Sequence, residues 1–268
     1  MLFRSLTLAM LDAGKVPGTA WLGVCFGIAA FASDLWAARR DFSMRAVNES
    51  LLRTTLAPVL AAILALQVAP TRPDTWLSAL VTLAIIVPMG PNLYRIAFRP
   101  LAESSVLTMF IAAIGAHFAM TGLGLVFFGA EGLRARPLSG AVIPMGPLIV
   151  TGQILYIYAI TLVSMIGLAL FFGRTLAGKA LIATAMNRLG ARLVAVRTEI
   201  AGRLSFALAA LIGALSGILI APMTTVFYDT GFLIGLKGFV GAILGGMGSY
   251  PLAAAGSIAV GMLESFSS

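Results

Sequence analysis

The sequence predicts an all-α membrane protein: a helical bundle with about six full spans and a broken or re-entrant helix pair near the C-terminus. Hydrophobic residues make up 60% of the 268 residues and charged residues only 10%, whereas a soluble domain has about 25% charged residues. The apolar residues gather in runs, and a bilayer-spanning helix needs about 20 such residues. The basic residues stand between these runs rather than on one soluble face, so the net charge of +8 does not indicate nucleic-acid binding.

The first two apolar runs differ in length. Residues Met1–Lys15 are weakly amphipathic, and Val16–Trp36 is too long for the apolar core of a signal peptide, so we predict that it is the first span. Asp34, near its end, is expected at the membrane interface. Leu56–Ala69 reaches span length only together with the two leucines at positions 51 and 52.

The next spans are clearer. Trp76–Tyr94 has an aromatic residue at each end, where interfacial aromatics belong, and Pro88 and Pro91 predict a kink. Ser105–Phe128 is the most uniform apolar run. The remaining predicted spans are Leu148–Phe172, which follows a loop rich in glycine and proline at Gly129–Gly146, and Leu204–Ala221.

The segment Gly173–Arg203 contains six basic residues against one acid, Glu199. Apolar residues recur in it at spacings of three and four, which predicts short amphipathic helices. Ala185 is expected to share a helix face with Leu181 and Leu189, four residues to either side. Two explanations stay open: the basic residues hold this loop on the cytoplasmic side, or the segment docks a cytosolic partner.

The last apolar stretch, Gly231–Leu263, is interrupted by GGMGSYP at Gly245–Pro251. It predicts either a broken or re-entrant pair, which a membrane permits where the backbone is buried in protein or lines a cavity, or two short spans joined by a tight turn. We predict that the turn needs its glycines, Gly246 among them, because a side chain there would clash. Lys237 is expected to snorkel to the interface or to contact another helix.

The distribution of basic residues predicts the topology. If residues 37–54, 95–104 and 173–203 lie inside, twelve basic residues are inside and five are outside. This asymmetry agrees with the positive-inside rule and places the N-terminus outside.

Motifs for catalysis are absent from the sequence. Gly173 and Gly178-Lys179 have the spacing of a phosphate-binding loop, but Ala180 stands where that loop has serine or threonine, so the chain is not itself an ATPase. No zinc-protease motif, paired acids within a span or Cys/His cluster indicates an enzyme, a cofactor or a metal site. His117, the single histidine, lies inside a span and is therefore a functional candidate; a neutral histidine bonded to a neighbouring helix backbone is the favoured interpretation.

Four segments in this order resemble the permease subunit of the branched-chain amino acid ABC importer family. The similarity extends from about residue 51 to Ser268. The segments are YRIAFRPL at Tyr94–Leu101, GRTLAGKALIATAMNRLGARLVAV at Gly173–Val196, ALIGALSGILIAP at Ala210–Pro222 and GFLIGLKGFVGAILGGMGSYPLAAAGSIAVGMLES at Gly231–Ser265.

The resemblance implies a multi-pass subunit of the bacterial inner membrane that conducts branched-chain amino acids or related small polar solutes, such as amides or urea. Its implied partners are cytosolic ATPase subunits, a second permease, a periplasmic binding protein and membrane lipid, without nucleic acid. Residues 173–203 would be the loop that couples to the ATPase, with contacts at Gly178, Lys179, Ala185, Asn187, Arg188, Ala191, Arg192 and Leu193. Candidates for the translocation pathway are Thr224, Thr225, Gly245, Gly246, Gly248 and Ser249.

The chain is expected to form one permease domain over residues 1–268, with two departures from the family pattern. Residues 1–50 are atypical, because Asp41–Arg45 only weakly resembles the N-F-A-H-G-E segment of such permeases. A final span is expected to be missing after Leu263–Ser265. The alternative function is therefore a truncated or diverged membrane protein that keeps the fold without transporting. A membrane-embedded enzyme has no paired catalytic groups to support it.

Overall fold

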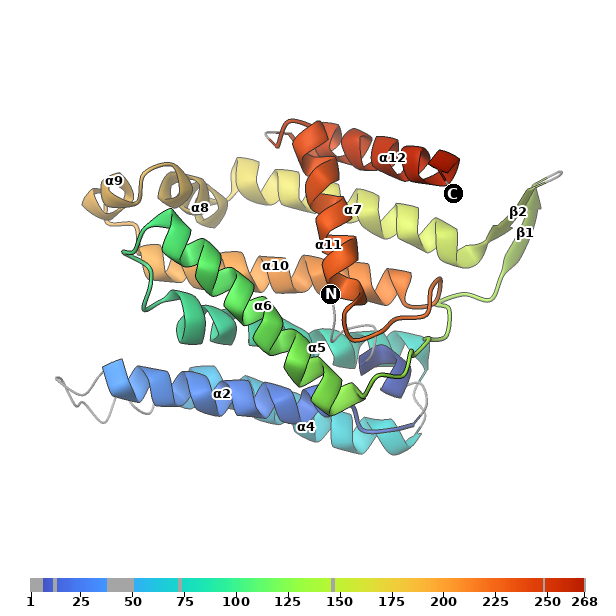
Figure 1. Ribbon diagram of the computed structural model, residues 1–268, viewed down its shortest axis with the longest axis horizontal. Coiled ribbons are helices and arrows are strands. Elements are labelled where there is room, and N and C mark those ends of the chain that lie inside the picture. Colours follow the sequence, from blue (N-terminus) through green and yellow to red (C-terminus); the bar gives the residue numbers. More distant parts are fainter. Residues whose placement is uncertain are drawn as a thin grey trace.

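The computed structural model describes residues 7–11, 14–37, 51–71, 74–145, 148–247 and 249–267, and these are mainly helical (Figure 1). In chain order the elements are α2 (Gly18–Ala37), the π-helical turn η2 (Leu52–Leu56), α4 (Ala57–Val68), the 3-10 turn η3 (Ala69–Thr71), α5 (Thr75–Leu93), the π-helical turn η4 (Tyr94–Phe98), α6 (Val106–Phe128), β1 (Val142–Met145), β2 (Leu148–Thr151), α7 (Gly152–Arg174), α8 (Leu176–Met186), α9 (Arg188–Leu193), α10 (Thr198–Ile220), α11 (Thr230–Leu244) and α12 (Tyr250–Ser267).

Six helical segments among the described residues are long and apolar enough to cross a membrane. They are Gly18–Trp36, Thr54–Thr71, Thr75–Phe98, Leu107–Phe128, Gly152–Arg174 and Thr198–Ile220. Figure 1 shows most of them running along the long axis of the molecule. The predicted all-α membrane bundle with six spans is therefore confirmed.

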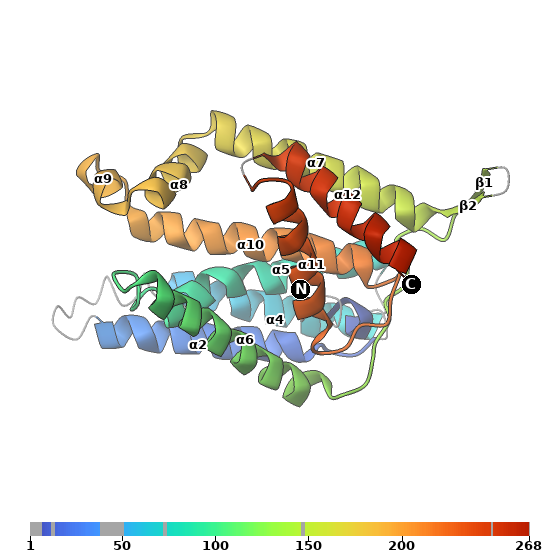
Figure 2. The same ribbon diagram turned by 45° about the horizontal axis from the view of Figure 1, so that its top comes forward.

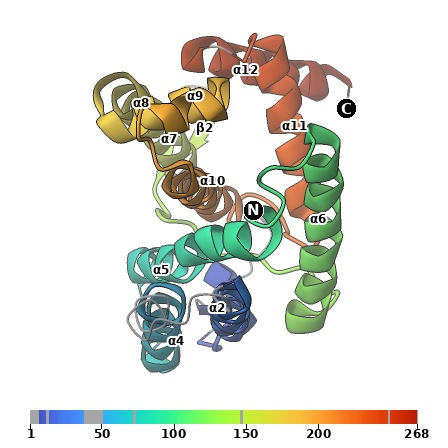
Figure 3. The same ribbon diagram turned by 90° about the vertical axis from the view of Figure 1, so that its left-hand side faces the viewer.

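Helix α5 lies at the centre of the bundle, between α10 on one side and α2 and α4 on the other (Figure 3). Half of the apolar 18-residue window of its span is buried, whereas none of the corresponding window of the α7 span is. A Cβ atom on Gly90 of α5 would lie 2.4 Å from the carbonyl oxygen of Phe206 in α10. The missing side chain therefore lets these two helices approach closely, as small residues do at membrane helix contacts.

The C-terminal end of α5 differs from the prediction. Pro88 and Pro91 lie inside the helix, which continues as the π-helical turn η4. Tyr94 is buried, with its ring centroid 5.3 Å from that of Phe206. Its placement as an interfacial aromatic was wrong, because the chain does not leave the bundle until after η4. At the other end Trp76 is half-exposed, as an interfacial residue would be.

Two boundaries also differ from the prediction. Residues 148–151 form a strand that pairs antiparallel with β1, and the helix begins only at Gly152. Isoleucine, valine and threonine dominate this stretch, and β-branched residues favour strands. Helix α10 begins at Thr198, several residues before the predicted start at Leu204, so the basic segment contains its first turns.

The loops gather at two ends. Helices α8 and α9 lie at the same end as the turn between η4 and α6, and Figure 3 looks onto this end. The β-hairpin and the C-terminus lie at the opposite end (Figures 1 and 2). This grouping agrees with the predicted topology for residues 95–104 and 173–203; most of the third inner loop, 37–54, lies outside the described residues.

Cysteine labelling tests this topology. In a Cys25→Ser background expressed without partner subunits, we expect Leu193→Cys to react with a membrane-impermeant maleimide only after the cells are permeabilised. Gly140→Cys, in the exposed loop at the opposite end, should react in intact cells. Ready labelling of Leu193→Cys in intact cells would show that the orientation is the reverse of the predicted one.

Helices α11 and α12 are two short helices packed against each other, an arrangement that fits both a re-entrant pair and two short spans. Helix α11 lies across the long axis of the molecule, and α12 leads toward the end at which the C-terminus lies (Figures 1 and 2). Glycines allow the two helices to touch: a Cβ atom on Gly256 would lie 2.3 Å from the carbonyl oxygen of Gly241. Lys237 of α11 pairs with Glu264 of α12, so the expected helix contact of Lys237 is an ion pair.

Candidate functional site

The basic segment folds into two short helices, as predicted, because polar side chains cap both of them. The hydroxyl oxygen of Thr175 accepts a hydrogen bond from the backbone of Gly178 at 3.0 Å and starts α8. Asn187 has extended backbone angles, and its side chain caps α9. The break at Asn187 places Ala185 and Leu189 in different helices. The predicted common face of Leu181, Ala185 and Leu189 was therefore wrong.

Two of the residues predicted to contact a partner are buried in the chain itself. A Cβ atom on Gly178 would lie 2.3 Å from the carbonyl oxygen of Phe171, and Ala191 is 3% exposed. These residues let α8 and α9 pack, and they are not available for direct contact. Exposed members of the predicted set are Lys179, Ala185, Asn187, Arg192 and Leu193.

An exposed apolar patch lies on the same two helices. We call it the inner apolar patch; it consists of Met186, Leu189, Leu193 and Val194, each between 70% and 82% exposed. Of these residues, only Leu193 was among those predicted to contact the ATPase. Clustered apolar side chains at a loop end are typical of a protein-interaction site. In the sequence Met186, Leu189 and Leu193 stand at spacings of three and four, as the residues of a buried helix face do, so no local signal marked them as exposed.

Two arginines hold α9 against the neighbouring turn. The guanidinium of Arg188 donates a hydrogen bond to the carbonyl oxygen of Ala102. Arg192 pairs with Glu103 at 2.9 Å and donates to the hydroxyl of Thr198 at 3.3 Å. These two basic side chains therefore bind other residues of the same chain, and in this way they position α9 and its apolar patch.

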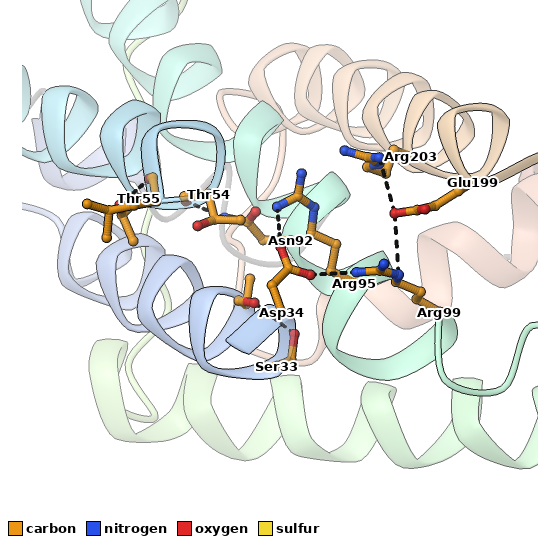
Figure 4. Close-up of polar contacts among 11 residues, drawn as sticks. Ser33, Asp34, Thr54, Thr55, Asn92, Arg95, Arg99, Glu199 and Arg203 are labelled. Atoms are coloured by element: carbon orange, nitrogen blue, oxygen red, sulfur yellow. Dashed lines mark hydrogen bonds and ion pairs between the residues drawn. The ribbon is translucent and has the colours of Figure 1, made fainter. Parts of the chain in front are cut away.

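A chain of ion pairs lies behind this surface and joins α2, η4 and α10 (Figure 4). Asp34 pairs with Arg95 at 3.0 Å and with Arg99 at 2.6 Å. Arg99 also reaches Glu199 at 3.3 Å, and Glu199 pairs with Arg203 at 3.1 Å. The side chains of Arg95 and Asp34 are only 7% and 15% exposed. Asp34, which was expected at the membrane interface, is the largely buried partner of two arginines.

An apolar cavity of about 560 Å³ lies between α2, α5, α6, α10 and α11. Every lining residue is apolar or glycine except His117, whose ring centroid is 4.7 Å from that of Phe232. The residues around the cavity are Phe26, Ile86, Met89, Gly90, Leu93, His117, Met120, Phe206, Ala209, Ala210, Gly231, Phe232, Gly235, Leu236 and Phe239. Within the described part of the chain the imidazole packs against the ring of Phe232 and makes no hydrogen bond to a neighbouring helix, contrary to expectation.

The residues predicted to form the translocation pathway lie elsewhere. Thr224 and Thr225 belong to the loop after α10, next to the bridge between Val226 and Leu133. Gly245, Gly246 and Ser249 belong to the turn between α11 and α12, and Gly248 lies outside the described residues. No described member of this set lines the cavity, so its role in translocation stays a prediction.

Comparison with known proteins gives one consistent similarity. The model of the family described as branched-chain amino acid transport system / permease component matches residues 43–268. The chain is 30% identical over 183 residues to the high-affinity branched-chain amino acid transport system permease protein BraD of Pseudomonas aeruginosa, covering 66% of this chain and 60% of that protein. It is 28% identical over 185 residues to LivH of Escherichia coli K12, a permease protein of the same description, covering 67% and 60% respectively.

The chain thus spans about three fifths of the length of these curated relatives. No solved structure matches.

Proposed function

The chain belongs to the family of permease components of branched-chain amino acid transport systems, and on this premise we propose that it is the permease subunit of an ATP-driven importer. It forms part of the translocation pathway in a bacterial inner membrane, beside a second permease. A separate cytosolic ATPase hydrolyses ATP, and a periplasmic binding protein delivers the solute.

The inner apolar patch is the observation that supports coupling to an ATPase. A loop that only fixes topology needs its basic charges, and it has no use for four apolar side chains exposed at the inner end. A docking surface needs both an apolar contact area and a fixed position. Arg188 and Arg192 provide that position, because they hold α9 against Ala102 and Glu103.

The apolar cavity supports branched-chain amino acids over amides or urea as the solute. Its lining offers apolar surface and one imidazole. An aliphatic side chain gains from burial in such a cavity, whereas urea and short amides would lose hydrogen bonds to water without replacing them.

Co-purification with the ATPase tests the coupling proposal. We expect Leu193→Asp to reduce the ATPase recovered per permease about tenfold, since apolar anchors at an interface are each worth on the order of 1–2 kcal/mol. Ala185→Trp should weaken recovery as well, because it adds bulk beside the patch without changing any charge. Both variants should insert into the membrane normally and uncouple transport.

Gly140→Asp is the matched control, because it adds the same charge at an exposed position of the opposite end and meets no other atom within 4 Å. Unchanged ATPase recovery with Leu193→Asp would leave topology as the only role of the segment. Normal ATPase recovery without uptake of any solute would favour the non-transporting alternative.

A further inference from the structure

We propose that the cavity receives the apolar side chain of the transported solute, and that the bare Cα of Gly235 on α11 sets how large that side chain can be. This inference rests on the proposed function. It adds the place in the bundle where the solute is recognised and the residue that limits its size.

The shape and lining of the cavity support a solute site. Its volume of about 560 Å³ is within the range of ligand pockets, which are mostly apolar with few polar groups. His117 stands in the middle of α6, and Ala209 and Ala210 stand in the middle of α10. The cavity is therefore at the depth that a solute must cross, and its walls come from five different helices.

Two of the three glycines in the lining, Gly90 and Gly235, have different reasons to be glycine. At Gly90 a side chain is excluded by the backbone of Phe206, so helix packing explains that residue. At Gly235 an added Cβ atom would meet no atom within 4 Å, although the residue lines the cavity. Packing within the chain does not require glycine there. Its effect is to leave space in the cavity.

His117 provides the polar contact of the site. It is the one titratable residue in the lining, and its ring packs against that of Phe232 of α11. A solute whose side chain lies among the phenylalanines and methionines can direct its polar end toward this imidazole. A lipid chain that entered the same space would have no use for such a group, and it is the competing occupant that the test must exclude.

A size series at Gly235 tests the proposal in cells that contain all the transport subunits. Uptake of leucine and of valine is measured for Gly235→Ala, Gly235→Val and Gly235→Phe. We expect leucine uptake to fall before valine uptake along the series, with the ratio changing by about tenfold, the discrimination that one methylene supports in an apolar pocket. Gly238→Phe is the matched control: it lies three residues along the same helix, meets no atom within 4 Å and does not line the cavity. Its ratio should equal that of the unaltered chain.

The outcomes separate the two proposals. Absence of uptake by the unaltered chain would overturn the proposed function. Uptake by the unaltered chain, with the same leucine-to-valine ratio in all three Gly235 variants at normal abundance, would overturn the cavity proposal alone. If Gly235→Phe does not accumulate in the membrane, the uptake ratios of Gly235→Ala and Gly235→Val test the cavity proposal.

A binding readout gives an independent check. In a Cys25→Ser background of the assembled transporter, leucine should slow the reaction of Gly235→Cys with a small thiol reagent. Urea should not slow it, and Gly238→Cys should be unaffected by either solute. Equal reaction rates of Gly235→Cys with and without leucine would mean that lipid or water, and not the solute, fills the cavity.

Discussion

Replacement of Asp34 by alanine is expected to lower the free energy of unfolding by about 3–5 kcal/mol, because it leaves a buried charge without its partner. Asp34 contacts Arg95 and Arg99 from a different helix. The side chain of Arg95 is 7% exposed, so water cannot replace the lost carboxylate.

Thermal unfolding of the purified protein in detergent measures this effect. Glu199→Ala is the control, because Glu199 is 41% exposed and exposed ion pairs are worth about 0–1 kcal/mol. Adding Arg95→Leu to Asp34→Ala should restore part of the lost stability, since it removes the buried charge. An Asp34→Ala variant that unfolds at the temperature of the unaltered protein would contradict the view that this pair holds α2 against η4.

Replacement of Gly245 by leucine is expected to separate α11 from α12. A Cβ atom on Gly245 would lie 2.3 Å from the carbonyl oxygen of Leu252 and 2.4 Å from the Cα of Ala253. Both are backbone atoms, so a side-chain rotation cannot relieve the clash. Overpacking of this kind costs about 1–3 kcal/mol, and the Lys237–Glu264 pair would be strained as the helices move apart.

The other glycines of the pair give graded controls. Gly261→Leu on α12 meets no atom within 4 Å and should leave stability unchanged. Gly246 also has open space, but its φ of +80° favours glycine, so Gly246→Ala should cost about 1 kcal/mol through backbone strain. The reason given from the sequence, a clash at Gly246, was wrong; the clash belongs to Gly245. Equal melting temperatures for Gly245→Leu and Gly261→Leu would show that the turn is an ordinary loop.

The spans and the basic segment could be predicted from the sequence because their signals are local. A membrane helix satisfies its backbone hydrogen bonds within itself, so the length and polarity of one segment are enough to recognise it. The break at Asn187 is also a local feature, because its capping side chain acts only three residues along the chain, but the apolar spacing predicted a common face across it. Family membership was also predictable, since it rests on segments of sequence.

The tertiary structure alone decided which residues face one another. Asp34 and Arg95 are 61 residues apart in the chain, and nothing in either segment specifies the other. Tyrosine and glycine often occur at surfaces, but α10 packs against Tyr94 and α7 packs against Gly178, so both residues are buried. The cavity depends on five helices at once, and the open space beside Gly235 depends on the absence of atoms from its neighbours. Such features follow from packing between distant segments, which hydrophobic patterning does not encode.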